Sequence, residues 1–253
     1  MSSRVLITAG ASGVGRAMAE AFDASGARVW IADVDEVALA GCPDHWQRSR
    51  ADVADEAAVS ALFREVEAEW GGLDVLCANA GIAGPTAPIE DVRLDDWRTC
   101  LAVNLEGAFL CSKHAAPVLK RQGCGVVLIT SSTAGQYGYP NRAPYAAAKW
   151  GVIGLGKTLA MELGPFGVRC NVICPGAVEG PRMEGVLERE AAAKGMTRDQ
   201  VYQGYASGTS MGRFVEGRDI ANMAVFLASD AARLVSGQVI AVDGHTVNPD
   251  PKL

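Results

Sequence analysis

Residues 5–19 read VLITAGASGVGRAMA and join a short apolar run to a helical segment through a glycine-rich turn. Glycine allows positive φ and lets the backbone approach a bound group closely, and the N-terminus of the following helix stabilises an anion. A lone glycine pattern is weak evidence, because many tight strand-to-helix turns contain glycine. Its position at the first strand–helix junction of the chain nevertheless favours a phosphate-binding turn over an ordinary one.

The rest of the chain repeats this order of strand and helix. We expect strands at 5–8, 28–32, 75–78, 126–130, 169–174 and 238–242, with a weaker one near 48–51. We expect helices at 13–26 and at about 55–70, 94–121, 145–163 and 218–229. The strands are continuous apolar runs, which is typical of strands covered on both faces. The pattern predicts an α/β fold, with one doubly wound, Rossmann-type parallel sheet of about seven strands and helices on both faces.

One domain accounts for the whole chain. No internal repeat, low-complexity tract or change of composition divides residues 1–253, so we expect a single dinucleotide-binding catalytic domain. The segment 179–213 departs from the alternation because it is long, polar and helical in character. It follows a late strand, and ligands bind at the carboxyl ends of strands in such folds, so we predict that it forms a substrate lid.

Composition excludes several classes of protein. The formal net charge of -6 argues against nucleic acid or an anionic membrane as the partner. The 7 cysteines form no paired spacing, which indicates buried free thiols in a reducing compartment and no metal site or disulfide frame. No segment has the apolar length of a signal peptide or of a membrane span, which takes about 20 residues. A cytoplasmic protein is therefore expected.

An acidic residue ends the second strand, in VWIADVDE at residues 29–36. In a dinucleotide-binding fold, a carboxylate at the position of Asp33 accepts hydrogen bonds from ribose hydroxyls and repels a 2′-phosphate. No lysine or arginine adjoins Asp33, so the sequence favours NAD over NADP as the cofactor.

At this point the chain resembles the short-chain dehydrogenase/reductase family over nearly its whole length. The resemblance rests on an ordered series of motifs, found at Thr8, Gly13, Gly15, Asp52, Asn79, Ala80, Gly81, Asn104, Ser132, Tyr145, Lys149, Pro175 and Gly176. It implies that NAD contacts a set of residues from the strand ends: Gly10, Ser12, Gly13, Val14, Gly15, Asp33, Asp52, Val53, Asn79, Ala80, Gly81, Tyr145, Lys149, Pro175, Gly176 and Val178.

Three positions depart from the family pattern. Ala9 stands where the first glycine of the turn is usual, and its methyl group needs room near the pyrophosphate. Ala78 replaces the first asparagine of an NNAG segment, whose side chain helps to hold the central strands together. Gly180 stands where a threonine often contacts the nicotinamide, so another group, such as the backbone near Val178, would orient that end.

Tyr145 and Lys149 lie one helical turn apart in PYAAAKWG, residues 144–151. Hydride transfer from an alcohol carbon requires proton transfer at the oxygen, but a free phenol titrates near about 10. An ammonium one turn away favours the phenolate, so Lys149 would lower the pKa of Tyr145 and also hold the nicotinamide ribose. Ser132 would donate to the substrate oxygen. Asn104, at a kink in its helix, would bind a water that links Lys149 to solvent.

Each of these residues also has an ordinary structural interpretation, such as a strand-end serine or an exposed helix lysine, and the ordered set makes the catalytic one stronger. The substrate is expected to contact Ser132 and Tyr145 and, from the loop and lid, Gln136, Arg142 and Arg182. These segments are polar, which favours a sugar, a polyol or a small hydroxy acid. Arg142 or Arg182 would pair with an anionic group.

The sequence therefore predicts an NAD-dependent oxidoreductase that interconverts a secondary alcohol and a ketone. A 3-oxoacyl thioester reductase remains as an enzyme alternative, and a catalytically silent NAD-binding protein as one of a different class. The resemblance also implies a homotetramer, formed through the two long helices that carry Asn104 and Tyr145 and through the C-terminal strand.

Overall fold

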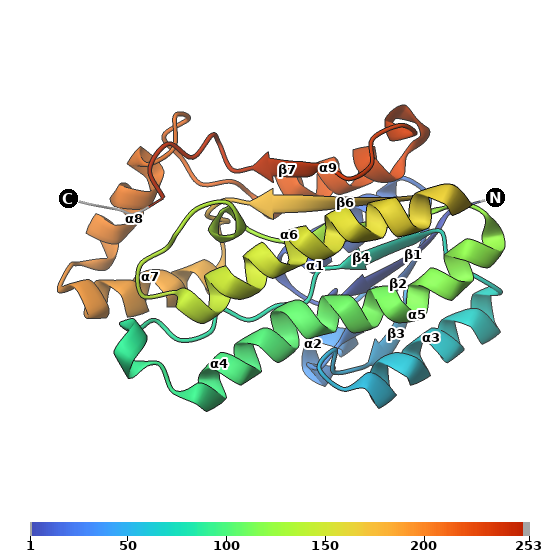
Figure 1. Cartoon of the computed structure of the whole chain (residues 1–253), viewed down its shortest axis with the longest axis horizontal. Coiled ribbons are helices and arrows are strands. Elements are labelled where there is room, and N and C mark those ends of the chain that lie inside the picture. The colour runs from blue at the N-terminus through green and yellow to red at the C-terminus, as the bar shows by residue number, and fades with distance from the viewer. Residues whose placement is uncertain (1, 250–253) are drawn as a thin grey trace.

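The computed structural model describes residues 2–249 of the protein. In that range seven parallel strands form one sheet, in the order β3-β2-β1-β4-β5-β6-β7 (Figure 1). They are β1 (Arg4–Thr8), β2 (Arg28–Asp33), β3 (Gln47–Arg50), β4 (Val75–Ala78), β5 (Gly125–Thr130), β6 (Val168–Pro175) and β7 (Val239–Val242). Each strand begins and ends within one residue of the expected position, so the predicted doubly wound sheet is confirmed.

Helices cover both faces of the sheet (Figure 1). They are α1 (Gly13–Ala24), α2 (Glu36–Ala40), α3 (Glu56–Trp70), α4 (Leu94–Leu101), α5 (Gly107–Gln122), α6 (Ala143–Leu163), α7 (Pro181–Lys194), α8 (Arg198–Ser207) and α9 (Gly217–Ala228). Short 3-10 turns lie at Ile89–Asp91, Thr133–Gly135, Gly164–Phe166 and Asp230–Ala232. The sequence analysis missed α2, which is short and mostly exposed. No helix among residues 2–249 is long and apolar enough to cross a membrane.

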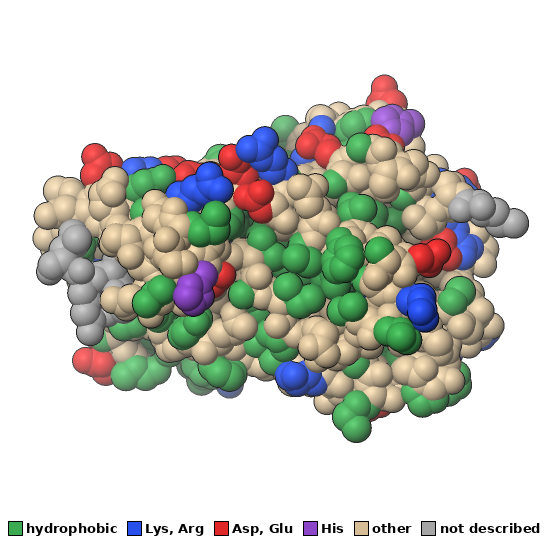
Figure 2. Space-filling model, turned by 90° about the horizontal axis from the view of Figure 1, so that it is seen from above, with side chains coloured by type: hydrophobic (Ala, Val, Ile, Leu, Met, Phe, Trp, Pro, Cys, Tyr) green, Lys and Arg blue, Asp and Glu red, His purple; other side chains and the backbone are tan. Residues whose placement is uncertain are grey.

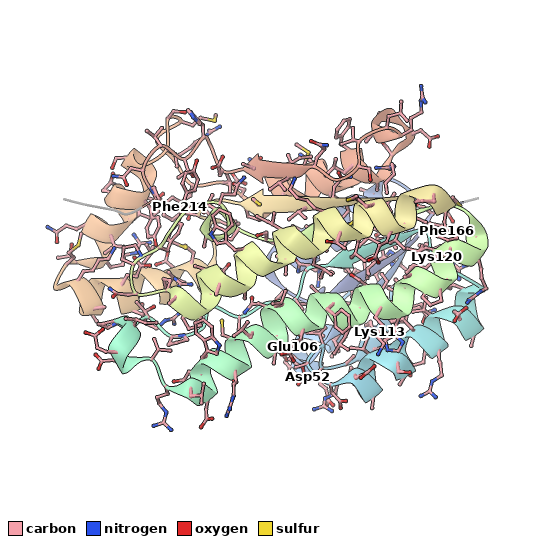
Figure 3. The ribbon with its side chains drawn as sticks, in the orientation of Figure 1. Asp52, Glu106, Lys113, Lys120, Phe166 and Phe214 are labelled. Carbon is pink, nitrogen blue, oxygen red and sulfur yellow. The ribbon has the colours of Figure 1, made fainter. Side chains whose placement is uncertain are left out.

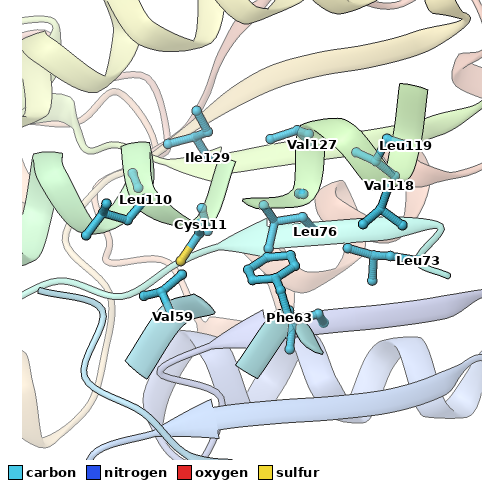
Figure 4. Packing of buried hydrophobic residues seen from close by; sticks show 14 of the residues in the cluster. Val59, Phe63, Leu73, Leu76, Leu110, Cys111, Val118, Leu119, Val127 and Ile129 are labelled. Carbon is cyan, nitrogen blue, oxygen red and sulfur yellow. The ribbon is translucent and has the colours of Figure 1, made fainter. Parts of the chain in front are cut away.

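Two apolar clusters hold the helices on the sheet. One cluster packs α3, α5 and α6 against one face, and Figure 4 shows its centre, where Phe63 of α3 and Cys111 of α5 lie against Leu76 of β4. The other cluster packs α1 and α9 against the opposite face, around Ile7 and Ile31. Because the strands are covered on both sides, their positions are fixed by burial, and the loops at their carboxyl ends are held in place.

The helix that carries Asn104 is interrupted, as expected. The π turn η2 (Ala102–Glu106) separates α4 from α5. A π turn inserts one residue into the helix, and such turns are frequent at functional sites. Here the turn places Asn104 in the interior, where its side chain is 1% exposed.

The predicted lid segment contains two helices, α7 and α8, which lie beyond the carboxyl ends of β6 and β7 (Figure 1). They have a small apolar cluster of their own. Phe214, labelled in Figure 3, follows α8 and stacks on Tyr202 with 4.3 Å between the ring centroids. Leu187 of α7 and Val201 of α8 are fully buried in the same cluster.

The cysteine prediction needs one correction. Six of the 7 cysteines are buried free thiols, and burial raises the pKa of Cys77 and Cys111 to about 12, which keeps both thiols protonated. Cys124, however, is exposed. It lies between Gly123 and Gly125 in the turn before β5, outside any apolar run, and this is why the general expectation of burial fails there.

Candidate active site

The glycine-rich turn lies where the strand order reverses, between β1 and β4. Gly13 has a φ of +53°, and α1 begins there with its N-terminus open for an anion. Gly15 has no room for a side chain, because a Cβ there would lie 2.0 Å from the carbonyl oxygen of Ala9. The turn therefore requires glycine at Gly15, and its free N–H groups suit a pyrophosphate.

Ala9 has a φ of +49°, in the left-handed region that favours glycine. This explains why the family has glycine at this position. We expect Ala9→Gly to raise the free energy of unfolding by about 0.5–1 kcal/mol, because glycine removes the left-handed strain.

Urea denaturation measures this change, with Ala68→Gly as the control. Ala68 is exposed in α3, where glycine should lower the free energy of unfolding by up to about 1 kcal/mol. The two substitutions are thus expected to act in opposite directions, and a loss of stability in Ala9→Gly would contradict the strain at this position.

Asp33 is 9% exposed at the end of β2 and faces the turn. Its carboxylate accepts hydrogen bonds from the backbone N–H of Ala11, at 3.2 Å, and of Asp35, at 3.2 Å. Asp52, labelled in Figure 3, is exposed and accepts from the N–H of Ala54 at 2.9 Å. Both carboxylates thus lie beside the ends of strands, and Asp33 also fixes the turn.

The side chain of Asn79 links three strands by hydrogen bonds. The alanine at position 78 has no polar side chain with which to do so. The Nδ2 of Asn79 donates to the carbonyl oxygen of Thr8 at 3.2 Å, and its Oδ1 accepts from the hydroxyl of Thr130 at 3.1 Å. The hydroxyl of Thr8 in turn accepts from the N–H groups of Asn79, at 3.0 Å, and Ala80, at 3.1 Å. Since Thr8, Asn79 and Thr130 end or follow β1, β4 and β5, this network holds the central strands without the missing asparagine.

Tyr145 and Lys149 share one face of α6 inside the molecule. The Nζ of Lys149 lies 5.7 Å from the centroid of the Tyr145 ring and donates to the carbonyl oxygen of Thr130 at 2.9 Å. Lys149 is only 2% exposed. Burying a cation is costly without a partner, so this lysine is held where its charge acts on the phenol.

Opposing influences set the pKa of Tyr145. Burial, the largest of them, raises the pKa, while the cations of Lys149, Arg182 and Arg142 and the hydroxyl of Ser132 lower it, and the net result lies below 10.0. The pKa of Lys149 is also lowered, by burial first and then by Arg182, against the opposing effect of Tyr145. The arrangement therefore favours the phenolate of Tyr145 more than the surroundings of a free tyrosine do.

Ser132 and Asn104 complete the set from two other elements. The Oγ of Ser132 accepts from the N–H of Ala134 at 3.1 Å, which leaves its hydrogen available to donate. The Nδ2 of Asn104 donates to the carbonyl oxygens of Cys100 at 2.8 Å and Ile82 at 3.1 Å. Its Oδ1 is buried and accepts from no described residue. A Cβ on Gly81 would lie 2.6 Å from this oxygen and 3.3 Å from Lys149 Nζ, so the two groups flank Gly81.

These elements surround a cleft of about 360 Å³. Many of the predicted residues line it: Ser12, Gly13, Val14, Gly15, Asn79, Gly81, Ser132, Arg142, Tyr145, Lys149, Pro175, Gly176, Val178 and Arg182. Others lie outside its wall: Gly10, Asp33, Asp52, Val53, Ala80, Asn104 and Gln136. The cleft runs from the glycine-rich turn to α7, so the proposed cofactor and substrate residues meet in one space.

Sequence reasoning missed a buried polar cluster behind Tyr145. The guanidinium of Arg142 lies 4.9 Å from the centroid of the Tyr145 ring, and its Nη1 lies 3.5 Å from the Oε1 of Glu190 on α7. The same oxygen accepts from the hydroxyl of Tyr205 on α8 at 2.7 Å. Positions 142, 190 and 205 follow no common spacing, so only the fold reveals that they meet.

The residues around this cleft fit a dinucleotide. The turn would present N–H groups to a pyrophosphate, Asp33, next to the cleft, would offer acceptors to a ribose, and Lys149 lies beside the phenol that would handle a proton. Fold and site together define a dinucleotide-dependent oxidoreductase.

Comparison with known proteins agrees with this class. The sequence model of a family described as Enoyl-(Acyl carrier protein) reductase matches residues 8–245. The chain is 38% identical to the cis-4-hydroxycyclohexanecarboxylate dehydrogenase of Sinomonas cyclohexanicum over 247 residues, 94% of each chain. The structure of Levodione Reductase is similar with a TM-score of 0.90 at 33% identity, over 96% of both chains. The structure of NAD+-bound Xylitol Dehydrogenase is similar with a TM-score of 0.93 at 27% identity, and the match covers 96% of this chain and 98% of that one. The chain belongs to the short-chain dehydrogenase/reductase family.

Proposed function

We propose that the protein is an NAD-dependent oxidoreductase that converts a secondary alcohol to a ketone and back. The observation that carries this proposal is the buried cation of Lys149 beside the phenol of Tyr145, in the same cleft as the glycine-rich turn. In oxidation, the substrate hydroxyl loses a proton to Tyr145, and a bound nicotinamide cofactor would take up the hydride from the carbinol carbon. The products are a ketone, reduced cofactor and one proton.

The chain's own residues bind, orient and move the proton. The phenolate of Tyr145 accepts it from the substrate hydroxyl, and Lys149 stabilises that phenolate. Ser132 donates to the substrate oxygen and fixes its position. A bound nicotinamide ring supplies the carbon that accepts or returns the hydride. The buried Oδ1 of Asn104 has no hydrogen-bond donor among the described residues, and it would accept from a water that passes the proton from Lys149 towards solvent.

The preference for NAD over NADP depends on Asp33. Asp33→Asn should lower the ratio of kcat/KM for NAD to that for NADP by about 10-fold to 100-fold, because a charged acceptor and a source of repulsion are lost together. Steady-state kinetics with each cofactor measures the ratio.

Asp35→Asn is the matched control for this substitution. Asp35 is the N-cap of α2, and asparagine caps as well as aspartate, so this change removes a neighbouring charge without loss of the helix. It should leave the ratio unchanged. If Asp33→Asn also left the ratio unchanged, the carboxylate would not select the cofactor.

A panel of alcohols tests the function itself. We expect absorbance of the reduced nicotinamide to rise when the protein is mixed with NAD and a small polar secondary alcohol. The relatives are named for such substrates, 4-hydroxycyclohexanecarboxylate and xylitol among them. Turnover of 3-oxoacyl thioesters alone would favour the alternative reductase. Binding of NAD without turnover of any alcohol or ketone would favour a silent binding protein.

The proposal also includes an assembly, a homotetramer, and a location in the cytoplasm. β7 is the edge strand of the sheet and is apolar but only half-buried, and Figure 2 shows hydrophobic side chains gathered in the middle of the face seen from above. Trp150 and Met161 of α6 are 52% and 80% exposed. These surfaces support a homotetramer in which β7 and α6 form contacts. The free thiols support a cytoplasmic location.

A further inference from the structure

The substrate half of the cleft has an apolar wall whose hydroxyl groups are already bonded. Ala134, Ala177, Met183 and Val186 line it with the rings of Tyr139 and Tyr205. The hydroxyl of Tyr139 is hydrogen-bonded to Thr133 at 2.9 Å, and that of Tyr205 donates to Glu190 at 2.7 Å. This wall therefore presents carbon and ring surface to a ligand, with its polar atoms turned to partners in the protein.

Most charged groups of the cleft also have partners. The cation of Arg142 is matched by Glu190 at 3.5 Å, and both side chains are buried, at 7% and 3% exposure. Glu179, the acidic residue of the rim, accepts from the hydroxyl of Tyr202 at 2.9 Å. The ammonium of Lys149 donates a hydrogen bond to the carbonyl oxygen of Thr130 and lies beside the ring of Tyr145.

Arg182 is the exception among the charged residues that line the cleft. It is the second residue of α7, is exposed, and makes no hydrogen bond or ion pair with another described residue. Its charge nevertheless reaches the catalytic pair, since it lowers the pKa of both Tyr145 and Lys149. An unmatched guanidinium at the edge of an otherwise apolar wall is a site for an anionic group.

We propose that the substrate is a compact hydroxy acid whose carboxylate binds Arg182 while its carbinol group lies at Ser132 and Tyr145. Between these two points the apolar wall takes a hydrocarbon body, such as a small saturated ring. The inference rests on the proposed function, because it assumes that Ser132 and Tyr145 mark the reacting carbon.

The apolar wall favours such a hydroxy acid over a sugar or a polyol. Each hydroxyl of a polyol that leaves water needs a hydrogen-bond partner, and burying one without a partner is unfavourable. The two hydroxyl groups of the apolar wall each make a hydrogen bond within the protein already, so this wall offers few polar atoms for the several hydroxyls of a polyol. A ring acid has polar groups only at its two ends, where the reacting groups and Arg182 receive them.

The experiment compares 3- and 4-hydroxycyclohexanecarboxylate with their uncharged methyl esters, cyclohexanol and xylitol, using the full-length protein with NAD. We expect kcat/KM for at least one acid to exceed that for its ester by about 10-fold to 100-fold, the usual effect of a charged hydrogen bond. Arg182→Gln should remove this advantage, so that the acid and its ester have nearly equal kcat/KM in the variant. The ratio of the two is the readout, because the loss of this charge also alters the pKa of Tyr145 for both substrates. The advantage should also shrink as salt is added, because Arg182 is exposed.

Arg189→Gln is the matched control. Arg189 is exposed on the same helix but does not line the cleft, so the same loss of charge should leave the advantage of the acid intact. If the esters, cyclohexanol or xylitol are turned over but the acids have no advantage, or keep it in Arg182→Gln, the inference is wrong and the proposed function stands. If no alcohol in a broad panel is oxidised with either cofactor, the proposed function itself fails.

Discussion

Tyr145→Phe should lower kcat for alcohol oxidation by about 10³-fold or more and change the dissociation constant of the cofactor little. Phenylalanine keeps the ring that packs 4.9 Å from the guanidinium carbon of Arg142, but it has no oxygen to accept the proton. Absorbance of the reduced cofactor gives kcat, and quenching of tryptophan fluorescence gives binding.

Tyr137→Phe is the control for the loss of a hydroxyl in the same region. Tyr137 donates to the carbonyl oxygen of Thr246 at 3.2 Å and does not line the cleft, so kcat should be retained. A kcat for Tyr145→Phe within about tenfold of the wild type would remove the proposed base from the mechanism.

The pH dependence of the same reaction has a defined sign. Oxidation requires the phenolate of Tyr145, whose pKa lies below 10.0, so the rate should rise with pH and reach half of its maximum below pH 10.0. Reduction requires the protonated phenol, so its rate should fall over the same interval. Initial rates in both directions measure this, and an oxidation rate that reaches half of its maximum at or above pH 10.0 would contradict the lowered pKa.

The second large effect is expected at Glu190, which is 2% exposed. Its carboxylate lies 3.5 Å from Arg142 and 3.4 Å from Lys194, and it accepts from Tyr205. Glu190→Gln leaves the buried cation of Arg142 without a counter-charge, and breaking such a pair costs about 3–5 kcal/mol. We therefore expect the amides of α7 and α8 to exchange hydrogen at least about 100-fold faster.

Hydrogen exchange followed by mass spectrometry measures this effect segment by segment. Glu188→Gln is the control, because Glu188 is exposed on the same helix and loses the same charge. Exchange in the sheet should change much less than in α7 and α8, since the main apolar clusters lie elsewhere. Equal exchange rates in the two variants would show that the buried pair does not hold these helices.

The sheet could be predicted from the sequence because its signals are local. Most of the strands are apolar runs buried on both faces, which leaves few alternatives for them, whereas β3 is polar and partly exposed. The same is true of Tyr145 and Lys149, whose spacing on one helix determines that they share a face. The π turn could be anticipated at Asn104 only through the family resemblance, because no residue pattern there requires an inserted residue.

The remaining features depend on contacts between distant residues. Glu190 looks like a surface residue of a polar helix, and nothing near it in sequence indicates Arg142 or Tyr205. The left-handed φ of Ala9 arises from the turn and not from alanine itself, which disfavours it. The role of Asn79 as a bridge between strands depends on β1 and β5 both adjoining β4, a consequence of sheet order.

The separate apolar cluster of α7 and α8 has a consequence for how such enzymes diversify. Leu187, Val201 and Phe214 pack mainly against one another, whereas the proton-handling residues are anchored on the sheet and on α6. We expect that residues 179–214 can be exchanged between relatives as one unit, provided that the donor segment has an acidic residue at position 190 to pair with Arg142. A chimaera built in this way would inherit the donor's choice of alcohol and the recipient's reaction chemistry.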